Sequence, residues 1–352
     1  MIHTTAAIIL AGSHSWNADS LEALCPRTLL PVANAPLISY ALEWLRAARI
    51  TEVAICANDA NFAIQSYVKS GTQRKLEVYY YEDRIPRGPA GCVRDAAYAV
   101  PAEQYIVTDG SIIPTADLTA LRNAHHASGA AVTVVASVNR SEFESGNGGS
   151  RPVGIYAFHR RALDYVPATG YQDIKEALIP RLHHDNEAVH VFLIDRAAPR
   201  ILDLPTYFAA QAWLLERVQK SELAIEGYEY TDGVFLHQTA RLAQRARIVG
   251  PVMVGPHSRV EDDALIVGPS VLGRNCIVGR RAVLEQAVLW DSVTIGEGAI
   301  IDRCLISNGV AIQAGSMKRG VVCSYDTQAV AVQGMSGFAT FASPRDSAIM
   351  KG

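Results

Sequence analysis

Glycine and carboxylate residues follow three strand-like segments in the N-terminal half of the chain. Gly12 comes after the apolar run at residues 6–10, residues 88–91 come after the run at 76–81, and Asp109 follows the run at 105–108. In open α/β sheets, ligands bind beyond the carboxyl ends of the strands. Glycines there let the backbone approach a ligand closely, and they also form tight strand-to-helix turns. The pattern is compatible with nucleotide binding and with turn formation alike.

The elements that must position these loops alternate between strand-like and helical patterns. Apolar residues recur at three- and four-residue spacing from Leu37 to Ala48, which is typical of a helix packed on a sheet. Further helical patterns cover residues 61–68, 91–100 and 118–127, and further strand-like runs cover 52–57, 130–138 and 153–158. This alternation predicts an α/β fold with a Rossmann-like, doubly wound, parallel or mixed sheet.

The first loop lies in the segment AAIILAGSHSWNADSLEALCPRTLLPV, residues 6–32. This segment resembles the opening strand, phosphate loop and P-K-P-L-L-P-V segment of the sugar nucleotidyltransferases, or NDP-sugar pyrophosphorylases, in which L-A-G precedes G-x-G-T-R. In an ungapped alignment the two glycines fall on Ser13 and Ser15, the threonine on Trp16, the arginine on Asn17 and the lysine on Arg27. The resemblance implies the nucleotidyltransferase fold, with most of the phosphate-loop chemistry replaced.

Two further segments extend the resemblance. Residues 82–91, EDRIPRGPAG, are similar to the family's E-x-x-P-x-G-T-A-G, which holds the base and ribose, and residues 153–158, VGIYAF, are similar to the G-I-Y-x-F strand beneath the sugar. The second match implies that Gly154 binds the sugar. Together the matches imply nucleotide contacts from Ala11, Gly12, Ser13, Glu82, Gly88, Pro89, Ala90, Gly91 and Asp109.

The carboxylates that hold Mg²⁺ in this family are only partly matched. The aspartate of the family's N-G-D motif aligns with Ser111, and a neutral hydroxyl is a poor replacement for a carboxylate on a hard cation. Asp109 lies two residues earlier, on the same side of an extended chain, and is the alternative ligand. Leu202-Asp203-Leu204 resembles the W-x-D-I-G element, which implies Asp203 as the second ligand. An active protein would therefore hold Mg²⁺ through Asp203 and Asp109.

The implied reaction, attack of a sugar 1-phosphate on a nucleoside triphosphate, depends on charge neutralisation and alignment. Arg27 keeps the charge of the family's catalytic lysine, but a guanidinium places its donors differently. Residues 139–153 contain no lysine, whereas the family has a sugar-phosphate lysine in this connection. His14, Arg84 and Arg87 are candidates to replace the lost charges, or are solvated loop residues. Because removing one preorganised charge costs about 10²–10³ in rate, we expect weakened or absent catalysis.

The C-terminal third has a six-residue repeat of apolar residues, which predicts a left-handed parallel β-helix of hexapeptide coils. The pattern slips around residues 285–294 and resumes at Ile295 and Ile301, so we expect a loop or an extra residue in one coil. Residues 288–312 resemble the β-helix of the GDP-mannose and ADP-glucose branches, where it serves assembly and regulation. The repeated positions are Leu242, Ile248, Val254, Val260, Ile266, Leu272, Val278 and Leu284.

These patterns divide the chain into four parts. We expect a nucleotidyltransferase-like domain at 1–220, a linker at 221–239, the β-helix at 240–324 and a C-terminal tail at 325–352. His257 lies at a coil edge, where some hexapeptide proteins carry an acyltransferase histidine, although a lone histidine there is more often a surface residue. Acyl transfer is the least favoured alternative.

Composition narrows the classes of partner. The net charge of −3 and the pI near 6.4 give no electrostatic footprint for nucleic acid or anionic lipid. The six cysteines show no C-x-x-C spacing, so the sequence predicts neither a zinc site nor a disulfide framework. No apolar run approaches the ~20 residues of a membrane span. We expect a cytoplasmic protein that forms a homo-oligomer, or a hetero-oligomer with an active paralogue, through its β-helix.

Two functions remain open from the sequence. The favoured one is a regulatory, scaffolding or nucleotide-sugar-binding subunit with degenerate catalytic residues, since the resemblance covers families that include catalytically silent subunits. The alternative is an active NDP-sugar pyrophosphorylase, for example of the mannose-1-phosphate guanylyltransferase type, with an altered active site. The base and the sugar are not specified by these residues.

Overall fold

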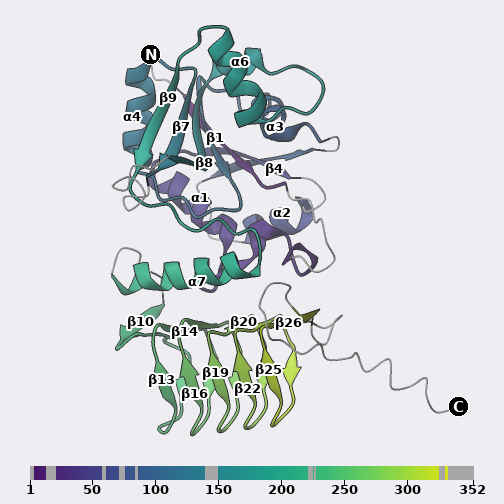
Figure 1. Ribbon diagram of the computed structural model, residues 1–352, viewed down its shortest axis with the longest axis vertical. Coiled ribbons are helices and arrows are strands. Elements are labelled where there is room, and N and C mark those ends of the chain that lie inside the picture. Colours follow the sequence, from purple (N-terminus) through teal and green to yellow (C-terminus); the bar gives the residue numbers. More distant parts are fainter. Residues whose placement is uncertain are drawn as a thin grey trace, which may run out of the picture. The chain divides into compact units, whose positions relative to one another are not determined.

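The computed structural model describes residues 4–12, 21–57, 61–70, 76–83, 86–138, 150–220, 225, 227–324 and 330–331 of the 352-residue chain (Figure 1). The chain folds into two compact units. The first comprises Met1–Trp16, Cys25–Leu30 and Pro36–Ile201, and the second comprises Asn17–Leu24, Pro31–Ala35 and Leu202–Gly352. Within the described ranges, every helix is too short or too polar to cross a lipid bilayer.

The first unit is built on a seven-stranded mixed sheet with the order β5-β4-β1-β6-β8-β7-β9. Strands β5, β4, β1 and β6 run parallel, β8 is antiparallel to both β6 and β7, and β7 is parallel to β9. This arrangement confirms the predicted α/β class. The strands are β1 (Thr5–Leu10), β4 (Glu52–Ala57), β5 (Glu77–Glu82), β6 (Gln104–Asp109), β7 (Val132–Ser137), β8 (Arg151–His159) and β9 (Val189–Ile194).

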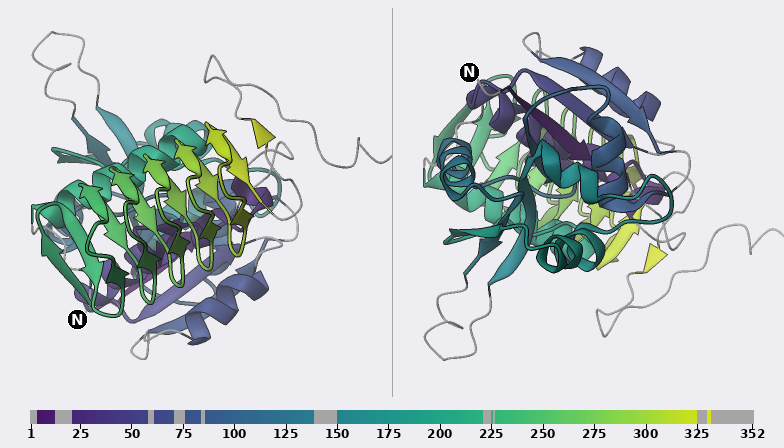
Figure 2. Two further views of the ribbon diagram at one scale, coloured as in Figure 1. Left: turned by 90° about the horizontal axis from the view of Figure 1, so that it is seen from below. Right: turned by 90° about the horizontal axis from the view of Figure 1, so that it is seen from above.

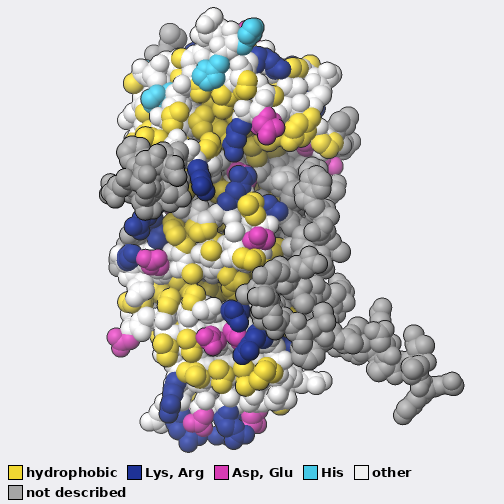
Figure 3. All heavy atoms as spheres, viewed as in Figure 1, with side chains coloured by type: hydrophobic (Ala, Val, Ile, Leu, Met, Phe, Trp, Pro, Cys, Tyr) yellow, Lys and Arg dark blue, Asp and Glu magenta, His cyan; other side chains and the backbone are white. Residues whose placement is uncertain are grey.

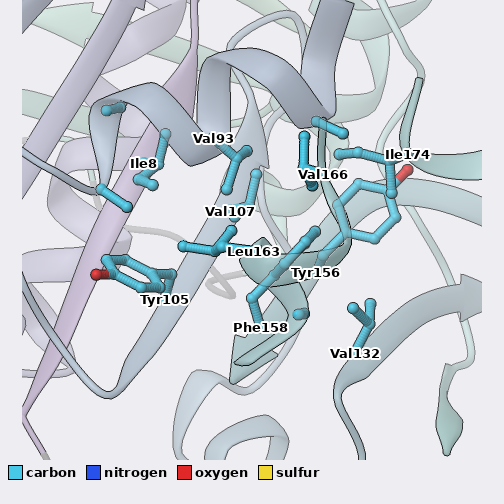
Figure 4. Close-up of a cluster of buried hydrophobic side chains, with 14 of the residues drawn as sticks. Ile8, Val93, Tyr105, Val107, Val132, Tyr156, Phe158, Leu163, Val166 and Ile174 are labelled. Atoms are coloured by element: carbon cyan, nitrogen blue, oxygen red, sulfur yellow. The ribbon is translucent and has the colours of Figure 1, made fainter. Parts of the chain in front are cut away.

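Helices cover both faces of this sheet, because alternate strand residues point to opposite faces. Ala7 and Ile9 of β1 belong to the core beneath α1, α2 and α4, whereas Ile8 belongs to the core beneath α3 and α6. Figure 4 shows the second core, in which Tyr156 and Phe158 of β8 meet edge to face. The helical elements of this unit are α1 (Leu37–Ala47), α2 (Asn61–Ser70), α3 (Gly88–Ala96), α4 (Leu118–Ser128), α6 (Ile179–His184), the 3₁₀ turns η2 (Arg27–Leu29) and η3 (Arg160–Tyr165), and the π-helical η4 (Ile174–Leu178). The 3₁₀ turn η1 (Leu21–Ala23) belongs to the second unit.

The second unit contains the predicted β-helix, whose coils stack strand on strand into three parallel sheets (Figure 2). One sheet also carries an antiparallel strand at each end. Its order is β10 (Tyr228–Thr231), β11 (Val234–His237), β14 (Val252–Val254), β17 (Ser270–Leu272), β20 (Val288–Leu289), β23 (Leu305–Ile306), β26 (Val321–Cys323) and β27 (Val330–Ala331). The second sheet contains β12 (Arg241–Leu242), β15 (Arg259–Val260), β18 (Ile277–Val278), β21 (Thr294–Ile295) and β24 (Ala311–Ile312). The third sheet contains β13 (Arg247–Val249), β16 (Leu265–Val267), β19 (Val283–Glu285), β22 (Ile300–Asp302) and β25 (Met317–Arg319).

The slip in the repeat is a shortened coil. Leu272 pairs with Val254, 18 residues earlier, but with Leu289, only 17 residues later. The change falls at one corner of the coil. Two earlier coils form this corner with Gly250-Pro251 and Gly268-Pro269, and the next coil forms it at Gln286, whose φ is 48°. The expectation of a loop or an extra residue was therefore wrong, because a tighter left-handed corner removes one residue from the coil.

The second unit also contains α7 (Leu204–Gln219) and the hairpin strand β2 (Pro31–Val32), which pairs with β3 (Ala35–Pro36). The backbone N–H of Ala33 donates to Gln211 Oε1 at 2.8 Å, and Trp290 Nε1 donates to the Tyr207 hydroxyl at 3.0 Å. Asn34 Nδ2 donates to the Leu272 carbonyl at 2.8 Å. These bonds tie the hairpin and α7 to the β-helix.

Candidate functional site

Two of the predicted loops, those after β1 and β6, come together at the carboxyl edge of the sheet. Leu10 and Asp109 are paired residues at the ends of these strands, and the Gly110 N–H donates to the Leu10 carbonyl at 2.8 Å. On the other side, the Ala11 N–H donates to the Cys56 carbonyl at the end of β4, at 2.7 Å. Gly12 is exposed, and no atom of the described residues lies within 4 Å of the position where its side chain would begin. This edge thus presents the backbone of Ala11 and Gly12 beside the Asp109 carboxylate.

Arg27 reaches this edge on the short turn η2. The next residue, Thr28, is buried, and its Cγ2 atom would lie 2.6 Å from a Cβ atom placed on Gly110. Gly110 is therefore required for the turn to pack against the loop after β6. Thr28 Oγ1 is buried and, within the described residues, has no hydrogen-bond partner. Arg27 itself is half-buried.

Both oxygens of the Asp109 carboxylate have partners. Oδ1 accepts hydrogen bonds from the backbone N–H of Ser111 at 2.8 Å and from its hydroxyl at 2.7 Å. Oδ2 forms an ion pair with Nη2 of Arg200. Ser111, which aligns with the family's metal-binding aspartate, is only 6% exposed. A neutral buried hydroxyl and an arginine thus surround the remaining carboxylate.

The Asp109–Arg200 pair brings a second arginine to the edge. Burial lowers the pKa of Arg200 from its ordinary value, and the nearby positive charge of Arg27 lowers it further. A guanidinium nevertheless stays charged in proteins. Among the described residues, this edge thus includes the guanidinium groups of Arg27 and Arg200 beside the Asp109 carboxylate. Arg200 could not be predicted at this edge from the sequence, because no motif between residues 109 and 200 indicates that the two residues meet.

Gly154 lies on β8 beside Asp109. Its φ is 87°, and a Cβ atom placed there would lie 3.2 Å from Asp109 Cβ. The glycine therefore lets β8 pass the Asp109 side chain without strain. Its predicted contact with a sugar stays a prediction.

The segment expected to hold the base has internal contacts of its own. A Cβ atom on Gly88, whose φ is 72°, would lie 2.6 Å from the Gln172 carbonyl, which accepts the Ala90 N–H at 2.9 Å. Arg87 donates from Nη1 to Asp95 Oδ2 at 2.9 Å and from Nη2 to the Pro167 carbonyl at 2.8 Å. Gly88 and Arg87 thus have structural roles. Glu82 is exposed at the end of β5, Pro89 is half-buried, and Ala90 and Gly91 are buried in α3.

Asp203 caps the helix α7. Its Oδ1 accepts the Thr206 N–H at 2.9 Å, while the Thr206 hydroxyl accepts the Asp203 N–H at 2.9 Å. This reciprocal capping box gives Asp203 a structural reason to be present, independent of any metal. Asp203 is exposed and belongs to the second unit, whereas Asp109 belongs to the first. Its role as a metal ligand stays a prediction.

The residues around Asp109 do not fit the Mg²⁺ ion that the family resemblance implies. Magnesium demands near-octahedral oxygen coordination and usually uses one or two carboxylates. Here one Asp109 oxygen is held by Ser111 and the other by a cationic side chain. Across the described ranges, no group of three or more His, Cys, Asp or Glu residues is arranged to hold a metal ion.

Several predicted residues lie outside the described part of the chain. These are His14, Arg84, the phosphate-loop residues Ser13, Ser15, Trp16 and Asn17, and residues 139–149 of the lysine-free connection. His257 is described and is exposed at a coil corner with a φ of 59°.

Family comparisons match the two kinds of architecture separately. Residues 6–149 match the nucleotidyl transferase family, and residues 231–332 match the left-handed β-helix (LbH) domain of EIF2B subunit epsilon. The chain combines a nucleotidyl transferase domain with a left-handed β-helix domain. The nucleotidyl transferase match includes the carboxyl edge with Arg27, Asp109 and Ser111, whereas Arg200 lies beyond it.

Proteins with named activities align with most of the chain. One is a UTP–glucose-1-phosphate uridylyltransferase of Synechocystis, 24% identical across 87% of this chain and 90% of the relative. Another is a mannose-1-phosphate guanylyltransferase of Mycobacterium tuberculosis, 22% identical across 86% of this chain and 84% of the relative. A glucose-1-phosphate thymidylyltransferase of Streptomyces griseus is 36% identical, but only across 25% of this chain and 24% of the relative. The chain is thus similar to proteins that are named as nucleotidyltransferases of sugar 1-phosphates.

Proposed function

We propose that this chain is a sugar-nucleotidyltransferase-type protein that has given up catalysis and serves as a regulatory, scaffolding or nucleotide-sugar-binding subunit. The observation that carries this proposal is the state of Asp109. Its carboxylate is paired with Arg200, and the aligned metal-ligand position holds the buried Ser111. Phosphoryl transfer in this family relies on a cation that neutralises the reacting phosphates, so the loss of its carboxylate support removes a large electrostatic contribution.

The retained backbone at the carboxyl edge supports ligand binding. Ala11 and Gly12 remain at the end of β1, Gly12 is exposed, and the guanidinium groups of Arg27 and Arg200 supply positive charge. Arginine binds phosphate groups well because its planar fork donates two parallel hydrogen bonds. A nucleotide or nucleotide sugar is therefore the ligand class we assign to this edge.

The β-helix supports a role in assembly. Leu265, Val283, Ile300 and Met317 occupy the same outward register position in successive strands of the β13–β25 sheet. Figure 3 shows rows of hydrophobic side chains across this part of the molecule, and Met317 is 55% exposed. We propose that this ladder packs against a second copy or an active paralogue. Light scattering at micromolar concentration tests the first case, and a clean monomer would contradict self-association.

The test of lost catalysis is pyrophosphate release. The purified chain is incubated with Mg²⁺, each nucleoside triphosphate and glucose, mannose or N-acetylglucosamine 1-phosphate, with an active mannose-1-phosphate guanylyltransferase as the positive control. We expect release at the level of the enzyme-free background. Turnover above that level which disappears in Asp203→Asn would contradict the proposal. Asparagine keeps the helix cap and removes only the charge, so this variant separates the two roles of Asp203.

Binding is tested separately by calorimetric titration with GDP-mannose and UDP-glucose. Heat of binding with either ligand, in a chain without turnover, supports a ligand-sensing subunit. Silence with both ligands would restrict the proposal to scaffolding.

An active pyrophosphorylase remains the second candidate, because the relatives that cover most of the chain are named as uridylyltransferase and guanylyltransferase enzymes. In that case Arg27 would contact the reacting phosphates in place of lysine. The pyrophosphate assay distinguishes the two candidates directly.

A further inference from the structure

The loop between β9 and α7 delivers a fixed positive charge to Asp109. Arg200 sits next to Ile201, whose N–H donates to the Ser111 carbonyl at 3.2 Å. Four residues earlier, the Arg196 carbonyl accepts a hydrogen bond from the Thr115 hydroxyl at 3.1 Å. The segment that carries Arg200 is therefore attached at both ends to the chain that follows β6.

Both oxygens of the Asp109 carboxylate already accept hydrogen bonds. Among the described residues, three groups donate to it: the N–H of Ser111, the hydroxyl of Ser111 and the guanidinium of Arg200. A divalent cation would need the same oxygen lone pairs. It would also come close to the positive charges of Arg200 and Arg27, and like charges at short range repel. Arg200 thus neutralises the negative charge of Asp109, which a metal ion would otherwise neutralise.

We propose that the Arg200 guanidinium is a built-in counter-ion of Asp109, which keeps divalent metal ions off this carboxylate and, with Arg27, presents positive charge to a phosphate group. The metal-exclusion half stands on the Asp109 contacts alone. The phosphate half rests on the proposed function, because it assumes that a phosphate-bearing ligand enters at this edge.

The surroundings of Arg200 suit an anion. The Arg200 side chain is 41% exposed, so one side of the guanidinium faces solvent while Nη2 contacts Asp109. The positive charge of Arg27 is near enough to lower the pKa of Arg200, after the effect of burial. Among the described residues, Arg27 and Arg200 place two guanidinium groups near the Asp109 carboxylate. Gly12 lies just beyond the end of β1, the strand that pairs with β6.

Mn²⁺ binding tests the metal-exclusion half without any ligand or turnover. Free Mn²⁺ is measured by electron paramagnetic resonance during titration of the full-length wild type, Arg200→Gln, Asp109→Asn and the double variant. Arg196→Gln is the matched control, since it removes a positive charge from the same segment. Far-UV circular dichroism checks that each variant is folded.

We expect wild type, Asp109→Asn and Arg196→Gln to bind Mn²⁺ equally weakly. Arg200→Gln should bind at least about fivefold more tightly, corresponding to about 1 kcal/mol, and the double variant should lose this gain. A wild-type site that Asp109→Asn removes would overturn the proposal, and so would an unchanged affinity in folded Arg200→Gln. The comparison of wild type with Asp109→Asn decides the matter even where Arg200→Gln does not fold.

Inorganic pyrophosphate tests the phosphate half. We expect pyrophosphate to bind in EDTA, without any divalent ion, and its calorimetric dissociation constant in EDTA to rise at least about tenfold in Arg200→Gln but not in Arg196→Gln. Binding that requires Mg²⁺, or no binding in either buffer, would overturn this half. Pyrophosphate binding without GDP-mannose or UDP-glucose binding would instead refute only the nucleotide-sugar part of the proposed function.

Discussion

The β-helix and the carboxyl edge of the seven-stranded sheet satisfy their buried polar groups in different ways. In the β-helix, the Ser258 hydroxyl donates to the Gly273 carbonyl at 2.7 Å and accepts the Cys276 N–H at 2.8 Å, so one coil bonds to the next. At the sheet edge, Asp109 depends on a charged partner 91 residues away. The first arrangement repeats along the helix and serves stability. The second occurs at a single point, where one substitution changes the chemistry.

The largest effect should come from the β-helix core. Leu284 is fully buried between coils, so Leu284→Ala should lower the free energy of unfolding by about 2–5 kcal/mol through a cavity. Leu265→Ala, on the half-buried outward face, is the matched control and should cost clearly less. Urea unfolding followed by circular dichroism measures both. Equal losses would mean that the outward face is as important to stability as the core.

The inter-coil hydroxyl should have the next largest effect. Ser258→Ala leaves the Cys276 N–H and the Gly273 carbonyl without their buried partner, which should cost about 1–3 kcal/mol. Ser258→Cys places there the residue that the next coil has at the equivalent position, Cys276, and should cost less. The same unfolding experiment applies. A neutral Ser258→Ala would show that the coils do not depend on this bond.

The α/β core contains a buried histidine, His125, that should make the stability of the protein depend on pH. His125 is 2% exposed, its Nδ1 lies 2.8 Å from Thr133 Oγ1, and burial lowers its pKa from 6.5 to about 4. Between these values the unfolded chain binds the extra proton and the folded chain does not, so stability is lost as pH falls from about 6.5 towards 4. We expect this residue to account for about 2 kcal/mol between pH 7 and 5, and His125→Asn to reduce that difference. An identical pH dependence in the variant would contradict the burial effect.

The smallest effect belongs to Asp203. Asp203→Ala should destabilise the protein by about 1 kcal/mol through loss of the α7 cap, whereas Asp203→Asn should cost only a few tenths. Thermal unfolding of the two variants side by side measures this difference. A large loss in Asp203→Asn would indicate a role for the charge itself.

The architecture was predictable from the sequence because the apolar positions of its elements recur at regular spacing. The six-residue period from Leu242 to Leu284 predicted the β-helix, and alternating apolar patterns predicted the mixed sheet. The predicted direction of the slip was wrong, because the coil lacks one residue near Gln286 and does not contain an extra one. Over a short window, a missing residue and an added residue both interrupt the six-residue pattern. The helix α7 was not predicted from the sequence, and the structure places it in the same unit as the β-helix.

The candidate site was predictable only where a strand end positions a residue locally. Ala11, Gly12 and Asp109 lie together at adjacent strand ends, as expected for parallel neighbours. Arg200 follows β9 at the far side of the sheet order, and its contact with Asp109 depends on how the intervening chain returns. Gly88 and Arg87 matched a ligand-binding motif, and the structure adds packing roles that the motif does not reveal.

Single-turnover pyrophosphate formation, with the protein in excess over a radiolabelled nucleoside triphosphate, tests the central claim most directly. We expect no pyrophosphate above an enzyme-free control with any sugar 1-phosphate, in Mg²⁺ or in EDTA, because Asp109 is already paired with Arg200. Pyrophosphate formation that requires Mg²⁺ and disappears in Asp109→Asn would contradict it.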